Sequence, residues 1–148
     1  MPKERIFLGR APEFSIIREA YGEQTVLCII EIYIYQLAEF SGAKDKLTPQ
    51  ISTQLAATIA DQFSFLKISE FCYFISRMMA GFYERFYGKV DPMVVTMSLQ
   101  QFCKDRELVL TSLINEQRRR ALELEMQQPR KTCSWDEFVK MRERGEIE

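Results

Sequence analysis

Residues 24–40, QTVLCIIEIYIYQLAEF, decide the fold expected for this chain of 148 residues. Apolar side chains follow the helical period on two stripes of this segment: Leu27, Ile30, Ile34 and Leu37 on one, and Ile29, Tyr33 and Phe40 on the other. A helix that is apolar on several faces is surrounded by other elements. The segment therefore predicts the central helix of a helical bundle, ended by Ser41 and Gly42.

The sequence on either side of this segment predicts further helices. The 6 Gly and 5 Pro fall between stretches of helical period rather than at the short, regular spacing of a β protein. Upstream, residues 13–20 form a short helix. Downstream, Thr48 and Pro49 suit the N-cap and the first position of the next helix, and Ser69 suits the N-cap of a helix over residues 70–80.

Residues 82–90 predict a loop, and the residues after it predict the longest helix. Asp91 can accept a hydrogen bond from the first turn, and Pro92 fixes φ there. The core-facing stripe of this helix is Val95, Leu99, Phe102, Val109 and Leu113. Beyond Asn115 helix formers continue while apolar residues become rare, so the second half is expected to project in part from the body.

A short final helix follows. Pro129 breaks the long helix, and Ser134 with Glu137 matches a capping box. The predicted fold class is therefore all-α: a compact bundle of about five helices, with a long, partly projecting C-terminal helix and the short final helix. Residues 1–114 are expected to form a single helical body, and residues 115–148 a charged helical extension with a Trp-containing tail rather than a second domain.

The composition favours a binding protein over an enzyme. The chain has 20 basic and 21 acidic residues, and its net charge of -1 argues against holding nucleic acid by bulk charge. It has no histidine, which is the commonest general base and metal ligand. The sequence has no glycine-rich phosphate loop and no cluster of metal ligands. We therefore expect no catalytic residue, no cofactor and no metal.

The cysteines and the apolar runs indicate a reducing, cytoplasmic setting. Cys28, Cys72 and Cys103 lie among apolar neighbours and are expected to be small core residues with free thiols. An enzyme with Cys133 as nucleophile has little support, because no histidine can activate it. No apolar run approaches the roughly 20 residues of a membrane span, and residues 1–10 lack the apolar core of a signal peptide, so we expect no membrane association.

Cations and aromatic rings alternate over residues 77–89, a pattern by which single-stranded nucleic acid is bound. The candidate contact residues are Arg77, Arg85, Tyr87 and Lys89. The alternative is a turn whose rings fill the core between two helices. We favour this alternative because basic residues exceed acidic ones by only two, five against three, over residues 77–106.

Arg118, Arg119 and Arg120 form the only run of three basic residues in the sequence. On a helix these side chains fan apart instead of forming one stripe. Glu116 and Glu123 lie four residues from Arg120 and Arg119, where exposed ion pairs form. A solvated helix with such pairs is therefore the favoured interpretation, and phosphate contacts are the alternative.

Residues 67–108, KISEFCYFISRMMAGFYERFYGKVDPMVVTMSLQQFCKDREL, resemble a family of uncharacterised proteins from Bacteroidales genomes and their prophages and other mobile elements. The shared pattern is a helix, an aromatic and glycine turn at residues 81–88, Asp91-Pro92 and a second helix, often with a tryptophan near the C-terminus (here Trp135). The sequence departs from it at Glu84, where a small residue is expected. The resemblance implies no established activity, and its setting suggests replication or regulation on mobile DNA.

The leading functional hypothesis is a non-enzymatic adaptor that recruits a protein partner through residues 115–148. A homo-oligomer formed through the C-terminal helix is a further option. Trp135, the only tryptophan, suits a helix that docks into a partner's groove and equally one that docks on its own domain. The alternative hypothesis is a single-stranded nucleic-acid-binding module that uses residues 77–89, with phosphate contacts from residues 118–120.

Overall fold

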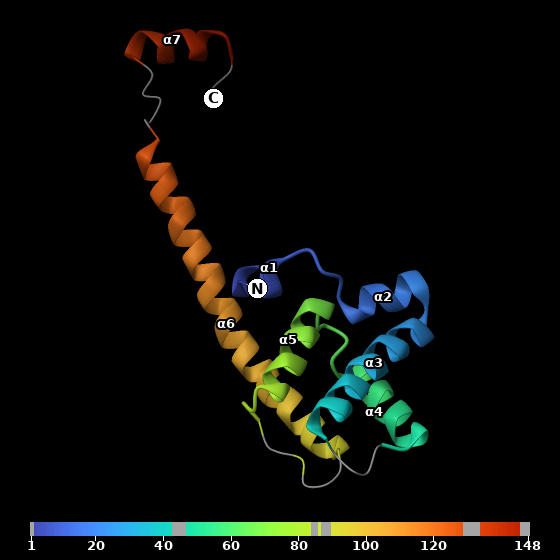
Figure 1. The fold of residues 1–148 in the computed structure, drawn as a ribbon. Coiled ribbons are helices and arrows are strands. Elements are labelled where there is room, and N and C mark those ends of the chain that lie inside the picture. The colour runs from blue at the N-terminus through green and yellow to red at the C-terminus, as the bar shows by residue number, and fades with distance from the viewer. Residues whose placement is uncertain (1, 43–46, 84–85, 87–89, 129–133, 146–148) are drawn as a thin grey trace. The chain divides into compact units, whose positions relative to one another are not determined.

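The computed structural model describes residues 2–42, 47–83, 86, 90–128 and 134–145, and its fold is all-α, as predicted. The chain separates into two units, Met1–Leu113 and Ile114–Glu148. The helices of the described residues (Figure 1) are α1 Lys3–Leu8, α2 Phe14–Tyr21, α3 Glu23–Ser41, α4 Pro49–Gln62, α5 Ile68–Met79, α6 Pro92–Gln127 and α7 Trp135–Glu143.

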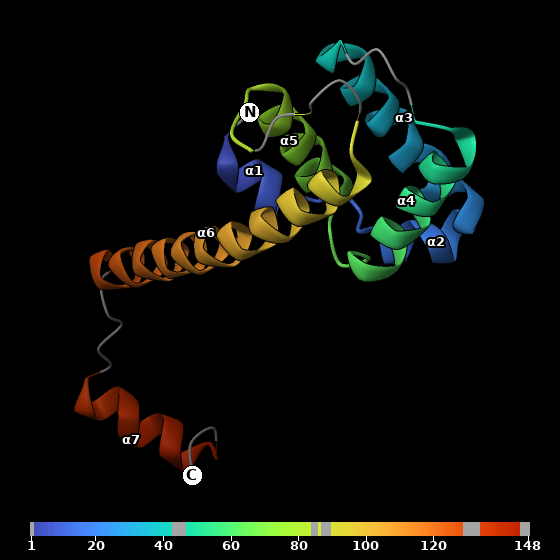
Figure 2. The same ribbon diagram turned by 90° about the horizontal axis from the view of Figure 1, so that it is seen from below.

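The core of the first unit is built around α3, the helix predicted to be central. α3 packs against α2, α4 and α5, and it lies beside α4 in both views of the ribbon (Figures 1 and 2). The residues that α3 buries are Val26, Ile30, Ile34, Leu37 and Ala38. Burial of such a stripe is the main stabilising contribution to a helix of this kind.

One face of α3 is exposed, so the prediction that other elements surround this helix is wrong. Ile32, Tyr35 and Phe40 are exposed. Cys28 is exposed as well, which corrects the expectation that it is a core residue. The reason is geometric, because the helices that pack on α3 cover only part of its circumference.

The sequence did not predict α1, which packs on α5. Its residues Ile6 and Phe7 are buried in the core. Lys67 Nζ donates to the carbonyls of Phe7 and Gly9 at 2.9 and 3.0 Å, and Ser69 Oγ donates to the carbonyl of Ile6 at 2.7 Å. The predicted N-cap role of Ser69 is therefore wrong: Lys67 occupies the N-cap position of α5, and the Ser69 hydroxyl serves a tertiary contact instead.

Three predicted helix starts are confirmed by their hydrogen bonds. Thr48 Oγ1 accepts from the backbone N–H three residues later at 3.3 Å, at the start of α4. Asp91 Oδ1 accepts from the backbone N–H of Met93 at 2.9 Å, at the start of α6. Ser134 and Glu137 form the capping box of α7. Each of these caps pairs groups that are two or three residues apart, so the local sequence is enough to predict it.

Replacing Asp91 by alanine is expected to lower the free energy of unfolding by about 0.5 to 2 kcal/mol, the usual cost of a lost N-cap. The physical reason is that the first turn of α6 loses both its acceptor and a negative charge near the helix N-terminus. Chemical denaturation followed by circular dichroism measures the change. Asp91→Asn is the matched control, because asparagine caps about as well as aspartate. An alanine variant as stable as the wild type would contradict the capping role.

The long helix α6 contributes to both units. Its residues Val95, Leu99 and Phe102 are buried in the first unit, and the predicted stripe continues through the partly buried Val109 and Leu113. From Ile114 onward α6 belongs to the second unit. The projection of α6 from the body stays a prediction. Among the described residues, none of the helices combines the length and the hydrophobicity that a membrane span requires.

Candidate functional site

Arg77, near the C-terminal end of α5, lies among aromatic rings. Its guanidinium carbon is 4.6 Å from the ring centroid of Phe82, 5.6 Å from that of Tyr73 and 5.9 Å from that of Tyr83. Its Nε is buried and has no hydrogen-bond partner among the described residues. Cation–π attraction is strongest where water is excluded. This geometry favours the packed-turn interpretation of Arg77 over display of its charge to a phosphate.

The other predicted contact residues of this turn lie outside the described residues and stay predictions: Arg85, Tyr87 and Lys89. Three rings of the turn are described: Tyr83 and Phe86 are partly buried against the core, whereas Phe82 is 66% exposed. Burial raises the pKa of Tyr83. Its hydroxyl, like Arg77 Nε, is buried without a hydrogen-bond partner in the described part of the chain. Two of the three described rings of the turn therefore contribute to the core.

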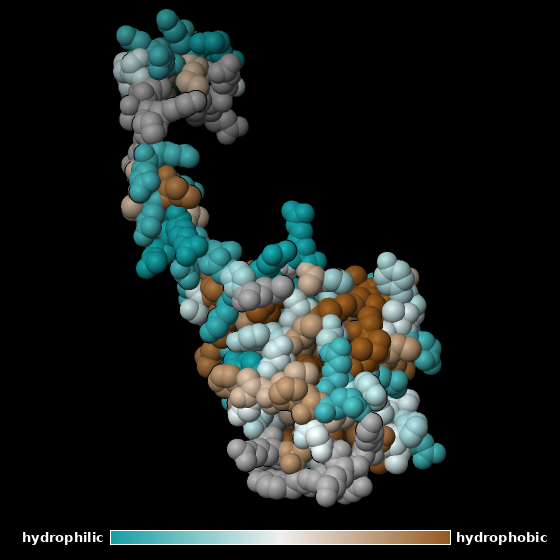
Figure 3. All heavy atoms as spheres, in the orientation of Figure 1, coloured by the Kyte–Doolittle hydropathy of each residue, from teal (hydrophilic) through white to brown (hydrophobic). Residues whose placement is uncertain are grey.

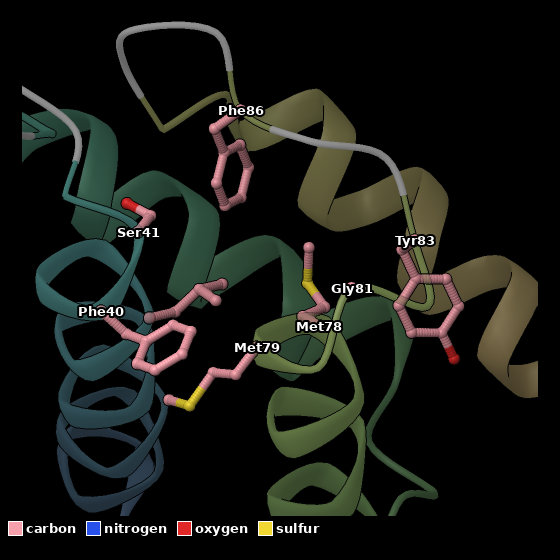
Figure 4. Close-up of a pocket in the computed structure, with 8 residues that line it drawn as sticks. Phe40, Ser41, Met78, Met79, Gly81, Tyr83 and Phe86 are labelled. Carbon is pink, nitrogen blue, oxygen red and sulfur yellow. The ribbon is translucent and has the colours of Figure 1, made fainter.

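An apolar pocket lies where the C-terminal ends of α3 and α5 meet the turn (Figure 4). Its volume is about 260 Å³. In the close-up, Phe40 of α3 and Met79 of α5 point into the space between their helices, while Tyr83 lies on the far side of Gly81. The lining residues are Leu37, Phe40, Ser41, Met78, Met79, Gly81, Tyr83 and Phe86.

The sequence did not predict this pocket, because its lining comes from segments that are far apart along the chain. Phe40 and Met79 are 39 positions apart and meet only through the packing of α3 on α5. Methionine side chains adapt their shape to different apolar groups. The pocket could therefore hold an apolar side chain or a small apolar molecule, and among the described residues its lining includes none with a charge that would select one ligand.

A buried ion pair joins α5 to α6. Glu70 is fully buried, and its Oε2 accepts from Arg106 Nε at 2.6 Å. The Arg106 guanidinium also lies over the ring of Phe65, 5.3 Å from its centroid. Burial raises the pKa of Glu70, and the positive charge of Arg106 opposes that rise. The sequence did not predict this pair, and its geometry indicates a structural link between the two helices rather than an acid/base pair.

The described thiols are not arranged as nucleophiles. Cys72 and Cys103 are partly buried, and Cys103 packs against the core at its edge. Cys72 Sγ donates to Tyr33 Oη at 2.9 Å. Burial raises the pKa of Cys103 to about 11, so this thiol stays protonated at neutral pH. Cys133, the cysteine considered as a nucleophile from the sequence, lies outside the described residues.

The basic run of α6 forms the predicted ion pairs. Arg120 Nη2 lies 2.6 Å from Glu116 Oε1, and Arg119 Nε lies 3.9 Å from Glu123 Oε1. Arg118 is exposed. Ion pairs as exposed as these contribute little to stability, and they reduce the charge that the run offers to a phosphate backbone.

Trp135 opens α7 and pairs with Phe138. The two rings stack with centroids 5.6 Å apart and an interplanar angle of 27°. Trp135 nevertheless is 75% exposed. Ser134 Oγ accepts from the backbone N–H of Glu137 at 3.3 Å and fixes the start of the helix that carries this aromatic pair.

Comparison with protein families places these features in a group of related sequences. The model of a family of unknown function, DUF6633, matches residues 46–145. The chain belongs to the DUF6633 family. No curated protein and no solved structure matches the chain.

The match confirms the predicted resemblance to a family without known function, since it includes residues 67–108. The setting in Bacteroidales and mobile elements stays a prediction. In this DUF6633 protein the matched range takes in α4, α5, α6 and α7, and with them the Glu70–Arg106 pair, Arg77 and Trp135. Within the described residues, no group of three or more potential ligands is placed to hold a metal ion.

Proposed function

We propose that this DUF6633 protein is a non-enzymatic helical adaptor, which recruits a partner protein through its C-terminal unit. The observation that supports the proposal is the exposed aromatic pair of α7, in which Trp135 stacks on Phe138 and still offers most of its surface to solvent. Tryptophan is the residue type that most often dominates a protein interface once a partner covers it. The pair is therefore suited to anchor a partner.

The helix that carries the pair is preorganised. Its capping box satisfies two backbone N–H donors: Glu137 Oε2 accepts from the Ser134 N–H at 3.3 Å, and Ser134 Oγ accepts from the Glu137 N–H. Ordering a helix before binding lowers the entropy lost on association. Further apolar side chains of the same unit are exposed on α6: Leu122, Leu124 and Met126.

A protein partner suits this unit better than a nucleic acid. Arg119 and Arg120 are already paired with glutamates, and the whole chain has a net charge of -1. The chain has no histidine, in keeping with a role in binding rather than catalysis. The proposal includes a cytoplasmic setting and a partner from the replication or regulation of a mobile element, which the family resemblance suggests.

Replacing Trp135 by alanine is expected to weaken partner binding by about 30-fold or more, the effect of losing an interface anchor of about 2 kcal/mol. The melting temperature should change little, because the side chain is exposed. Affinity-tagged full-length wild type and variant, expressed in the native host, identify the partner by quantitative mass spectrometry. The purified partner then gives the two dissociation constants by calorimetry.

Tyr21→Ala is the matched control, because Tyr21 is an exposed aromatic residue of the other unit. It should leave partner binding unchanged. The proposal fails when the Trp135 variant retains every partner at wild-type affinity. It also fails when capture disappears on nuclease treatment and falls steeply with salt, since that result would assign the chain to nucleic-acid binding.

A further inference from the structure

The exposed face of α3 carries a row of apolar side chains. Ile32 is 57% exposed and Tyr35 is 60% exposed, and Cys28 is exposed on the same stripe. We call these three residues the α3 seam. They lie on one side of the helix because they are four and three residues apart. A shallow surface hollow of about 530 Å³ is lined by the seam together with Glu31 and Gln36.

The spacing of the seam matches a helix as its occupant. Steps of four and three residues are the spacing of a and d positions, which receive the side chains of a second helix packed alongside. Such helix-on-helix recognition needs apolar residues at the same spacing on the partner. Hydrophobic atoms are also visible at the surface of the body over α2 and α3 (Figure 3). The surface is thus apolar enough for a helix to dock.

The charge around the seam selects the chemistry of that helix. α3 contains Glu23, Glu31 and Glu39 and no lysine or arginine. Glu31 lines the hollow. A helix with cationic flanks would complement this carboxylate. A second copy of α3 would bring the same carboxylate against it, and like charges across an interface disfavour that pairing.

We propose that the α3 seam binds an amphipathic helix of a partner protein, with apolar residues at heptad spacing flanked by lysine or arginine. The inference rests on α3 alone and goes beyond the proposed function of the C-terminal unit. Its test does not depend on whether α7 recruits a protein. With both surfaces occupied, the chain would bridge two partners.

The test uses the full-length protein and two synthetic peptides of about five helical turns. Both peptides have leucine at the a and d positions; one has lysine and the other glutamate at the flanking positions. Fluorescence anisotropy measures their affinity. The lysine peptide is expected to bind, and Ile32→Ser is expected to weaken it by about tenfold or more. Leu108→Ser is the control, because Leu108 is an exposed apolar residue on α6, outside the surface of α2 and α3, and it should bind like the wild type.

Two further measurements address charge and location. Glu31→Lys should weaken the lysine peptide and strengthen the glutamate peptide, because it reverses the charge beside the hollow. The bound lysine peptide should slow alkylation of Cys28, read by mass spectrometry of the peptide that contains it, because a helix on the seam covers that thiol.

Four results would overturn the inference. They are equal binding of the two peptides, wild-type affinity in Ile32→Ser, an equal loss in Leu108→Ser, and an unprotected Cys28. Light scattering adds a fifth, since a dimer that Ile32→Ser dissociates would assign the seam to a second copy of the chain. None of these outcomes depends on Trp135, so they separate this inference from the function proposed for α7.

Discussion

Phe102→Ala is expected to lower the free energy of unfolding by about 3 to 5 kcal/mol, the usual cost of removing a buried phenylalanine. Phe102 is only 1% exposed. Its ring lies 6.3 Å from that of Phe7, 6.1 Å from that of Tyr73 and 5.5 Å from that of Phe74, between centroids. These rings come from α1 and α5, so the truncation leaves a cavity where three helices meet. Urea denaturation of the purified variant measures the loss.

Leu108→Ala is the control for the Phe102 variant. It truncates an apolar side chain on the same helix, α6, but Leu108 is exposed. Its expected effect is within about 0.5 kcal/mol. A Phe102→Ala variant as stable as Leu108→Ala would contradict the packing of α1, α5 and α6 around this ring.

Arg106→Met is expected to lower the free energy of unfolding by about 2 to 3 kcal/mol at pH 7. The variant removes the cation that is hydrogen-bonded to a fully buried carboxylate, Glu70. Glu70 can respond by binding a proton, and at pH 7 that step costs a carboxyl of ordinary pKa about 3.7 kcal/mol. This protonation cost is the upper limit of the stability lost in Arg106→Met. The expected loss is smaller, because burial already raises the pKa of Glu70 in the wild type despite Arg106.

The pH dependence of this loss has a defined sign. The pKa of Glu70 is raised in the folded protein, so the stability contributed by its protonated form is present below the ordinary glutamate pKa of roughly 4.3 and is lost as pH rises through the folded pKa. Without Arg106 the pKa of Glu70 in the folded protein rises further, so the free energy of unfolding continues to fall up to a higher pH. The difference between variant and wild type should therefore shrink to about 1 kcal/mol or less at pH 5.

The double variant Glu70→Leu with Arg106→Met provides the control. It replaces both charges by apolar groups and should recover most of the stability lost in Arg106→Met, because no unpaired charge stays buried. Denaturation curves at pH 5 and pH 7 for the wild type, Arg106→Met and the double variant measure these differences in stability. An Arg106→Met penalty that is the same at both values would show that Glu70 is not the group that responds.

Local sequence determined the helices that begin with their own caps. Thr48, Asp91 and Ser134 each accept a backbone N–H two or three residues away, so the sequence alone predicted the starts of α4, α6 and α7. The ion pairs of Arg119 and Arg120 were predictable for the same reason, since their partners lie four residues away on the same helix. Helical period likewise predicted the all-α fold.

Only the tertiary structure decided which of these helical faces are covered. The sequence of α3 is apolar nearly all round, and the packing of α2, α4 and α5 determines that Ile34 is buried while Ile32 is exposed. Ser69 matches an N-cap by composition, yet its hydroxyl bonds the carbonyl of Ile6, which is 63 residues away. Such choices depend on partners distant in the sequence, which local propensity cannot specify.

The candidate sites differ in the same way: some involve neighbouring residues, and others join residues far apart in the sequence. Trp135 was identifiable from the sequence, because its capping box and its stacking on Phe138 are local to α7. The Glu70–Arg106 pair and the pocket of Phe40 and Met79 were not, because they join residues 36 and 39 positions apart. Local hydrogen bonds follow from the order of residues, whereas burial and long-range pairing follow from which helices pack together.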